Sequence, residues 1–480
     1  MAKFRNYYVW LAFGLIALGV IIFSLNTLTT KPRLWYDEGL NIEVSRNISY
    51  FGKIEVQTSP GNFSGSAVRM FQATGYAVTV PLAAFFKIFG FGPEEARVYM
   101  LLWMTAALFA VFYLVKKLAG AEEAFASLLL ISTFPPFYDN GRTVIGEVPG
   151  FLFLIVGAYF LIRGKYIRGG LFLGLSIATK ASTYIAILPA VAVYFFLAEN
   201  LRPRKFFHLC VGIIPPMILE VFFVLAHPFS VKSWTDVVSL FVNPYKGSVG
   251  LFTYFWRNII SLPKTTTIIY FLVLFAVVAT SHIFSVKRRV SEESLKKIFI
   301  FSAAYIFFAF IYYLKSPGWL RYLIAAELLV LILFTVYLKQ LIVITGSKKR
   351  IYYIVLLALV IFQGWYLATH AKIYYSNSEE EVLSVIEGNF PGKSVGVINI
   401  PQIASFIAPA EKYQTLKMVG VEQVGENPLL YDPPPDVLVF RTDERRLTEL
   451  LKEGERILNE RYSDFMTIGR YSIYKKRGGF

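Results

Sequence analysis

The sequence contains very little cysteine and few charged residues. Its 480 residues include one cysteine, Cys210, which excludes an intramolecular disulfide and a structural zinc site built on cysteines. Charged residues make up 17% of the chain, whereas soluble domains carry about 25%. Hydrophobic residues reach 56%, and internal repeats and low-complexity segments are lacking. This composition excludes an ordinary soluble enzyme, a disordered protein and a disulfide-stapled secreted module, and it predicts a polytopic α-helical membrane protein.

The net charge of +16 is unevenly distributed along the chain. Residues 1–369 hold 34 Lys and Arg against 16 Asp and Glu, whereas residues 370–480 hold 14 against 16. The excess of basic residues therefore lies in the hydrophobic part, where it is expected to reflect the orientation of the helices in the membrane. We expect no nucleic-acid partner.

Apolar runs predict about eleven membrane-spanning helices, since a helix needs about 17–25 apolar residues to cross the hydrocarbon core and fewer when it is buried among others. The predicted spans are 7–29, 98–115, 121–138, 144–162, 169–181, 183–198, 207–226, 265–285, 298–314, 322–338 and 351–368. The segment 169–181 is short, so it and the next span are expected to form a broken pair. Segment 76–90 is apolar but interrupted by Pro81, which predicts an interfacial or re-entrant helix.

The distribution of basic residues predicts the orientation. With the N-terminus cytoplasmic, 19 of the 34 basic residues of the hydrophobic part fall in the inner loops, as the positive-inside rule requires. An odd number of spans then places residues 370–480 outside the cytoplasm. Three apolar strands (394–400, 436–440 and 471–475) and a helical stretch at 443–458 predict a small soluble α/β domain there. The first 29 residues are expected to remain as an anchor, because no A-x-A-like cleavage site follows them.

The long outer loop, about residues 30–97, carries two adjacent carboxylates, Asp37 and Glu38, beside Trp35 and Tyr36. Aromatic residues anchor at membrane interfaces, which would hold these carboxylates near lipid head groups. After them, apolar residues recur at helical spacing from 40 to 51 and predict an amphipathic helix lying on the bilayer. The alternative is a solvated acidic pair on a loop.

Three acidic residues, Glu147, Glu220 and Glu327, fall within predicted spans. A charged side chain is costly inside a membrane, so each of them is a candidate functional residue. Each has a cationic or titratable neighbour toward the outer end of its helix, namely Arg142, His227 and Arg321. The separations of roughly 7–11 Å along the helix place all three acids at similar shallow depth. This favours a shared outward-opening cavity over separate hydrogen bonds between helices.

Four cations lie near the outer ends of spans: Lys180, Arg257, Lys315 and Arg321. Guanidinium and ammonium groups suit a phosphate, which at this place would belong to a lipid. The alternative is that these side chains reach out to ordinary lipid head groups.

Several motifs together resemble the integral-membrane glycosyltransferases of the GT-C fold, in the protein O-mannosyltransferase and aminoarabinose-transferase-like group. The motifs are Asp37-Glu38; Gly75…Pro81…Phe86-Lys87-Ile88-Phe89-Gly90; Arg142…Gly146-Glu147-Val148-Pro149; Gly170…Gly174…Ala178-Thr179-Lys180; and Gly318-Trp319-Leu320-Arg321-Tyr322. They extend over most of residues 1–340. The loop lacks the His-Pro-Pro or Lys-Pro-Pro of many relatives, so neither the sugar nor the acceptor follows from the resemblance.

The resemblance implies a sugar donor linked to polyprenyl or dolichyl phosphate and transfer on the non-cytoplasmic face to a protein, lipid or glycan. Asp37 corresponds to the catalytic base, with Glu38 beside it, and Lys180, Arg321 and Arg257 are candidates for binding the donor phosphate. The expected active-site wall comprises Asp139, Arg142, Glu147, Glu220, His227, Tyr322 and Glu327. A divalent metal (Mg²⁺ or Mn²⁺) is compatible with this chemistry, although no ligand set is legible in the sequence.

Two other functions are compatible with these patterns. A transporter or lipid flippase also needs charges within its spans, but such proteins usually show internal repeats. A non-catalytic assembly subunit would use its outer α/β tail and would tolerate substitution of Asp37 and Arg321.

Overall fold

A computed structural model describes residues 2–59, 62–64, 74–224, 251–287, 292–316, 318–370, 376–398, 400–407, 413–416, 434–441 and 458–478. The chain divides into two compact units. The first, here called the helical unit, comprises Met1–Thr27, Ala67–Val78 and Val98–Lys372. The second, here called the sheet unit, comprises Leu28–Ser66, Thr79–Arg97 and Ile373–Phe480. Most of the first outer loop is thus in one unit with the C-terminal residues, rather than with the helices as the expected division at 369 has it.

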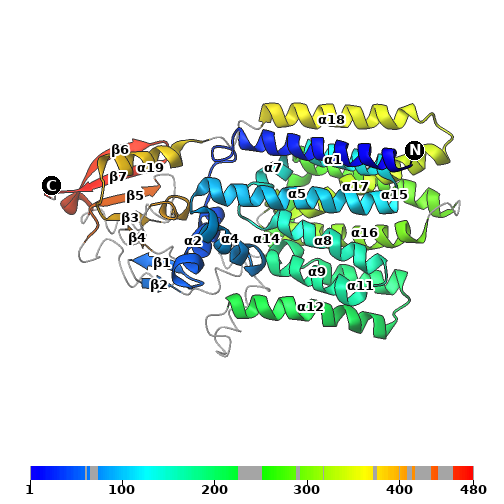
Figure 1. The fold of residues 1–480 in the computed structure, drawn as a ribbon, viewed down its shortest axis with the longest axis horizontal. Coiled ribbons are helices and arrows are strands. Elements are labelled where there is room, and N and C mark those ends of the chain that lie inside the picture. The colour runs from blue at the N-terminus through cyan, green and yellow to red at the C-terminus, as the bar shows by residue number, and fades with distance from the viewer. Residues whose placement is uncertain are drawn as a thin grey trace. The chain divides into compact units, whose positions relative to one another are not determined.

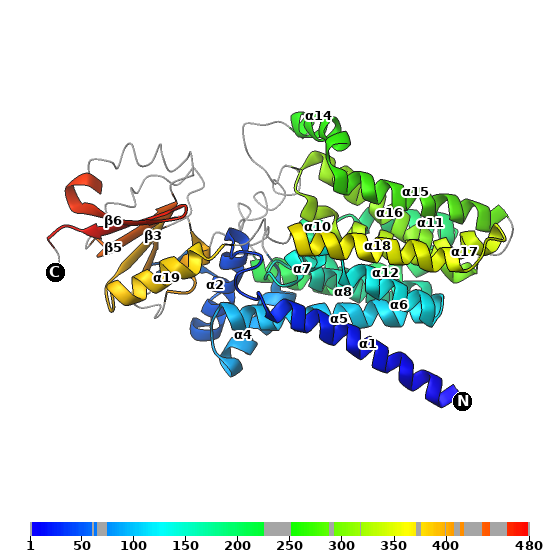
Figure 2. The same cartoon turned by 90° about the horizontal axis from the view of Figure 1, so that it is seen from above.

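Most helices of the helical unit run alongside one another (Figures 1 and 2). They are α1 (Ala2–Leu25), α5 (Pro93–Leu118), α6 (Ala121–Ser132), α7 (Pro135–Gly141), α8 (Glu147–Ile162), α9 (Tyr166–Thr179), α10 (Ala181–Tyr184), α11 (Ile187–Ala198), α12 (Pro203–Val224), α14 (Leu251–Ser261), α15 (Thr266–Lys287), α16 (Glu293–Lys315), α17 (Ile324–Ile344) and α18 (Arg350–His370), with 3-10 turns η1 (Leu262–Lys264) and η2 (Leu320–Leu323). Helix α4 (Tyr76–Phe89) and the first turn of α5 cross the boundary between the units.

Within the described residues, 8 helical segments are long and apolar enough to cross a membrane. They confirm the predicted polytopic α-helical membrane protein, and they correspond to eight of the predicted spans. The other three predictions differ in detail. The span 121–138 is divided into α6 and α7 before Pro135, and α8 and α9 have 16 and 14 residues. At 1.5 Å per residue these two helices extend about 24 and 21 Å, which is less than a hydrocarbon core of about 30 Å.

The predicted broken pair at 169–198 is confirmed. Helix α9 ends at Thr179, Lys180 leaves the helical conformation with φ −155° and ψ 83°, and α10 and α11 follow. Helix α9 packs closely on α12 because glycines face each other: a Cβ added to Gly170 would lie 2.1 Å from the Leu209 carbonyl oxygen. Small residues of this kind let membrane helices approach closely.

The ion pairs of Glu199 lie beyond the end of α11. Its carboxylate binds Lys205, and it lies 3.0 Å from Lys297 Nζ. Burial opposes ionisation of Glu199, but the two ammonium groups outweigh it and keep its pKa below the usual value of 4.5. These contacts join α12 and α16 at residues that we predict to lie on the cytoplasmic side.

The sheet unit contains a five-stranded sheet of order β4-β3-β5-β7-β6. Its strands are β3 (Val395–Ile398), β4 (Tyr413–Leu416), β5 (Val437–Arg441), β6 (Tyr462–Ile468) and β7 (Tyr471–Lys476). The first three pair in parallel, and β7 is antiparallel to both β5 and β6. The three predicted strands are therefore confirmed, whereas most of the helical stretch predicted at 443–458 lies outside the described residues.

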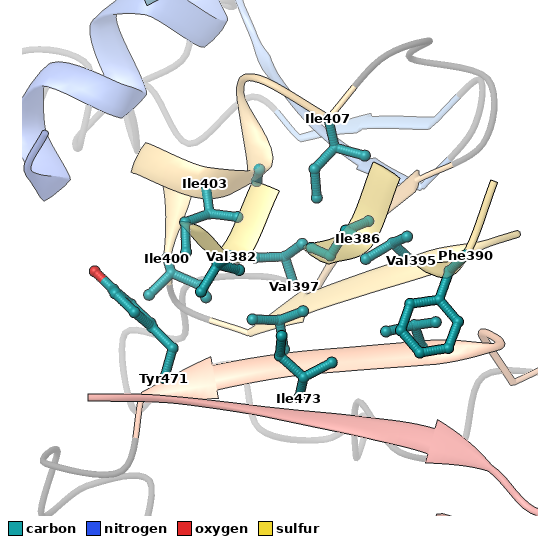
Figure 3. Packing of buried hydrophobic residues seen from close by; sticks show 13 residues of the cluster. Val382, Ile386, Phe390, Val395, Val397, Ile400, Ile403, Ile407, Tyr471 and Ile473 are labelled. Carbon is teal, nitrogen blue, oxygen red and sulfur yellow. The ribbon is translucent and has the colours of Figure 1, made fainter. Parts of the chain in front are cut away.

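Helices and a small second sheet complete this unit. They are α19 (Ser378–Asn389), α20 (Pro401–Ala404), α2 (Tyr36–Phe51), β1 (Val56–Ser59) and β2 (Asn62–Ser64). Side chains of α19, α20 and the sheet form one buried apolar core, as Figure 3 shows. Helix α2 confirms the helix expected after Asp37, but its polar face is not solvated: Glu43, Ser45 and Asn47 are all buried.

Candidate functional site

Asp37 and Glu38 both lie in the first turn of α2. Helix N-termini favour negative charge, so this turn suits two carboxylates. The two side chains differ in environment: Asp37 is half-buried, whereas Glu38 is fully buried. Their neighbours therefore decide which carboxylate a substrate could reach.

Arg97 binds both carboxylate oxygens of Glu38. Its Nε lies 2.9 Å from Oε1 and its Nη2 2.7 Å from Oε2, and both side chains are fully buried. The remaining nitrogen, Nη1, donates to the carbonyl oxygens of Leu28 and Pro32 at 2.6 and 2.7 Å. One guanidinium thus ties the start of the outer loop to the helix that carries Asp37. The sequence signal that was missed is an arginine at the boundary of the apolar run 98–115.

In the helical unit, three segments far apart in sequence meet around residues 74–76, here called the 74–76 junction. The Gly75 amide donates to the Thr179 carbonyl oxygen at 3.0 Å, and a Cβ on Gly75 would lie 1.8 Å from the Ala178 carbonyl oxygen. The Tyr76 amide donates to Glu220 Oε2 at 3.0 Å. Glu220 of α12 therefore accepts at the N-terminus of α4, beside the end of α9.

The start of α8 joins the same junction. Gly146 has a φ of 82°, and a Cβ there would lie 2.9 Å from the Thr179 carbonyl oxygen and 3.0 Å from Thr74 Cγ2. Glu147 follows, fully buried, and its carbonyl oxygen accepts from the Tyr184 hydroxyl of α10. The junction therefore brings together Glu220, the start of the helix that begins with Glu147, and the backbone before Lys180.

Arg321 and Tyr322 lie in η2, which packs against α10 directly after Lys180. The Arg321 guanidinium lies 4.8 Å from the Trp319 ring centre and 5.5 Å from that of Tyr322. Lys180 is 1% exposed. The backbone segments of the two proposed phosphate-binding cations are therefore neighbours within the helical unit.

Helix α14 packs against the end of α16, the segment that precedes η2 in the chain. The buried Asn258 donates from Nδ2 to the carbonyl oxygens of Tyr313, Leu314 and Ser316 at 3.2, 3.1 and 2.8 Å. The preceding residue, Arg257, is exposed, and its guanidinium lies 4.8 Å from the Tyr254 ring centre. Asn258 was missed because nothing in its neighbourhood marks it as buried.

The remaining predicted wall residues occupy different places. Arg142 is buried and donates to Thr27 Oγ1 at 3.0 Å, which ties the end of α7 to the segment after α1. Asp139 is half-buried on α7, and Glu327 is buried in the first turn of α17. His227 lies outside the described residues. In the ranges that the structure describes, no three His, Cys, Asp or Glu side chains gather in a way that could hold a metal ion.

Comparisons with known proteins give a family match over part of the chain and a fold for the whole of it. Residues 77–226 match the family model of dolichyl-phosphate-mannose-protein mannosyltransferases. The chain resembles ArnT from Cupriavidus metallidurans bound to undecaprenyl phosphate, with a TM-score of 0.62, 15% identity and 98% of both chains covered. For apo ArnT the TM-score is 0.64 at 13% identity, again over 98% of both chains.

A third structure, the arabinofuranosyltransferase AftD from Mycobacteria, has a TM-score of 0.55 and 12% identity, with 99% of this chain and 40% of AftD covered. No curated protein sequence matches the chain. Residues 77–226 therefore carry the pattern of this mannosyltransferase family, and the chain is a multi-pass membrane protein with the GT-C fold of membrane glycosyltransferases, as its motifs predicted.

Proposed function

We propose that this protein, as a glycosyltransferase of the GT-C fold, moves a sugar from a polyprenyl- or dolichyl-phosphate donor to an acceptor on the non-cytoplasmic face of the cell membrane. The observation that carries the proposal is the 74–76 junction, where three motifs of the resemblance meet. They lie within or beside the stretch that matches the mannosyltransferase family model. The ligand of the similar ArnT structure, undecaprenyl phosphate, supports a lipid phosphate as carrier.

Asp37 is the proposed general base. The acceptor hydroxyl or amide must lose a proton while it attacks the anomeric carbon, and a positioned carboxylate accelerates such a step by about 10²–10⁴-fold. Glu38 cannot share this task easily, because both of its oxygens bind Arg97. We therefore assign Glu38 to positioning the turn that carries Asp37.

Lys180 and Arg321 are the proposed ligands of the donor phosphate, with Arg257 as a further cation. The leaving group is a lipid phosphate, which is already a weak base, so cations that stabilise its charge matter more than a general acid. A single displacement by the acceptor would invert the anomeric centre. The adjacency of η2 and α10 supports joint action of the first two cations.

The wall of this site is proposed to be formed by polar residues of several helices. The N-terminus is proposed to be cytoplasmic, with the C-terminal domain outside. The wall residues are Asp139, Arg142, Glu147, Glu220, His227, Tyr322 and Glu327. The acceptor is proposed to be a protein, lipid or glycan.

Donor consumption tests the proposal. Full-length protein in detergent is incubated with a panel of polyprenyl-phosphate sugars and a cell lysate as acceptor source, and loss of each donor is followed by mass spectrometry. We expect the wild type to consume one donor and Asp37→Asn to lose at least about 100-fold in rate. Glu381→Gln is the matched control, because Glu381 is an exposed acid in the first turn of α19 in the same unit.

Two results would contradict the proposal at different levels. Equal turnover by wild type and Asp37→Asn would show that Asp37 is not the general base, but the protein would still be a glycosyltransferase. If folded wild-type protein consumes no donor, the proposed transferase function is wrong, and a transporter with an outward-facing charged cavity is favoured.

A further inference from the structure

The first turn of α2 packs directly on the C-terminal domain, and a glycine makes this contact possible. A Cβ added to Gly39 would lie 2.3 Å from the backbone nitrogen of Gln402 and 2.5 Å from its Cα. Side-chain carbons do not approach backbone atoms so closely, so only glycine fits. Gly39 is two residues after Asp37 in the same turn, which places α20 directly against the backbone that presents Asp37.

A second contact holds α2 farther along its length. Arg46 is 3% exposed and donates from Nη1 to the Ser405 carbonyl oxygen at 3.2 Å. Its guanidinium also lies 5.7 Å from the Phe91 ring centre, and Phe91 stacks on Phe406 at 5.9 Å. Helix α2 is therefore fixed to the C-terminal domain at two positions about two turns apart, by backbone packing and by a charged hydrogen bond.

Helix α20 is itself anchored in the sheet. Ile403 and Ala404 are fully buried in the core of Figure 3. Gln402 Nε2 donates to the Tyr471 hydroxyl at 3.3 Å, and that hydroxyl donates to Glu379 Oε1 at 2.6 Å. Burial, together with the Glu379 carboxylate, raises the pKa of Tyr471 to about 12, so the hydroxyl remains a donor at neutral pH. The surface that α20 presents to Gly39 is therefore held by core packing on one side and by a chain of hydrogen bonds.

We propose that the C-terminal domain is a working part of the active site: α20 sets the position of Asp37 through Gly39, and Arg46 supports the same contact. Gly39 and Arg46 are positioning residues, and this role rests on the proposed function of Asp37. A general base must be held to within a fraction of an ångström, and a displacement of 1 Å can cost about 10²-fold in rate. The first turn of a helix does not hold a side chain so firmly by itself, whereas a domain packed against that turn does.

The test compares two glycine-to-alanine variants of the full-length protein. Gly39→Ala introduces the clash with Gln402, whereas Gly388→Ala, in α19 of the same unit, adds a Cβ that meets nothing within 4 Å. Turnover is measured with the polyprenyl-phosphate sugar that the wild type consumes, as kcat and donor KM separately. Hydrogen exchange of residues 36–51 is measured without substrate, and Arg46→Lys serves as a milder variant if Gly39→Ala does not fold.

We expect Gly39→Ala to lower kcat by about 10- to 100-fold, with donor KM changed less than about threefold, and to speed exchange in α2. Gly388→Ala should match the wild type in all three. In an Asp37→Asn background, Gly39→Ala should cost almost nothing more, since two changes that act through one group are not additive.

Wild-type behaviour of Gly39→Ala in kcat and exchange would overturn the inference while the proposed function stands. An equal fold-loss in the Asp37→Asn background would also overturn it, because the effect would then be general destabilisation. If the wild type consumes no donor, the proposed function fails, and the exchange comparison alone decides whether α20 holds α2.

Discussion

Removal of the Arg97 side chain should destabilise the sheet unit strongly. In Arg97→Met, the Glu38 carboxyl group stays in a fully buried site and loses the two hydrogen bonds that Arg97 donates to it. Breaking a buried ion pair from one side costs about 3–5 kcal/mol. The Leu28 and Pro32 carbonyl oxygens also lose a donor, so the upper part of this range is expected.

This free energy translates into a measurable shift in thermal unfolding. For a cooperative unit of about 150–250 residues, each kcal/mol lowers Tm by about 2–4 °C, which gives a decrease of about 6–20 °C. The double variant Arg97→Met with Glu38→Leu removes the buried charge as well. It should therefore melt above Arg97→Met, although below the wild type, because the two carbonyl groups remain without their donor.

Thermal unfolding of the purified protein in detergent, followed by tryptophan fluorescence, measures these shifts. Arg461→Met is the matched control, since Arg461 is exposed in the same unit and should change Tm by less than about 2 °C. The reasoning is refuted if Arg97→Met behaves like this control. A double variant that melts no higher than Arg97→Met would show that the buried charge of Glu38 is not the source of the loss.

Three further changes have expected outcomes. Gly75→Ala should lower Tm or prevent folding, because the new Cβ would lie 1.8 Å from the Ala178 carbonyl oxygen, and overpacking costs about 1–3 kcal/mol or more. Asn258→Leu should cost about 1–3 kcal/mol through loss of three hydrogen bonds, measured as Tm. Glu199→Gln should lower Tm at pH 7, and this difference should shrink as the pH falls below about 4.5. The lowered pKa of Glu199 means that its ionised form stabilises the fold only above that range.

Each of these has a contrary result. Gly364→Ala is the control for Gly75→Ala, because its Cβ meets nothing within 4 Å; equal Tm values for the two would contradict the close packing. Unchanged Tm for Asn258→Leu would show that α14 is held by other contacts. A Tm difference for Glu199→Gln that grows toward low pH would reverse the assigned sign.

Sequence patterns predicted the parts of the fold that depend on local composition. Apolar runs located the long helices, and the break at Lys180 followed from the short run before it. The three sheet strands were found because each is a short apolar run in a polar tail. The family motifs around Gly75, Gly146 and Thr179 were recognised separately, and their meeting at one junction is what the structure adds.

The contacts that build the site could not be predicted, because they join residues far apart in the chain. Arg97 and Glu38 are 59 residues apart, and Arg46 and Ser405 are 359 apart. Helix α2 was expected to lie on the bilayer because its apolar residues recur at helical spacing. A single sequence does not show that the polar side chains Glu43 and Asn47 are buried, or that α2 packs against α20 from the C-terminal part of the chain.

The sheet unit is built from segments that are far apart in the chain, and this affects how the protein assembles during synthesis. Its segments Leu28–Ser66 and Thr79–Arg97 leave the ribosome before the helices from α6 to α18, whereas Ile373–Phe480 leaves after them. Helices with local contacts can form as the chain emerges, but contacts between distant segments must wait for both partners. The early loop therefore remains without its partner surface while the intervening helices are inserted. A ribosome that stalls before residue 400 would leave a chain with most of its helices in the membrane and its first loop unassembled, a state that cellular quality control can recognise.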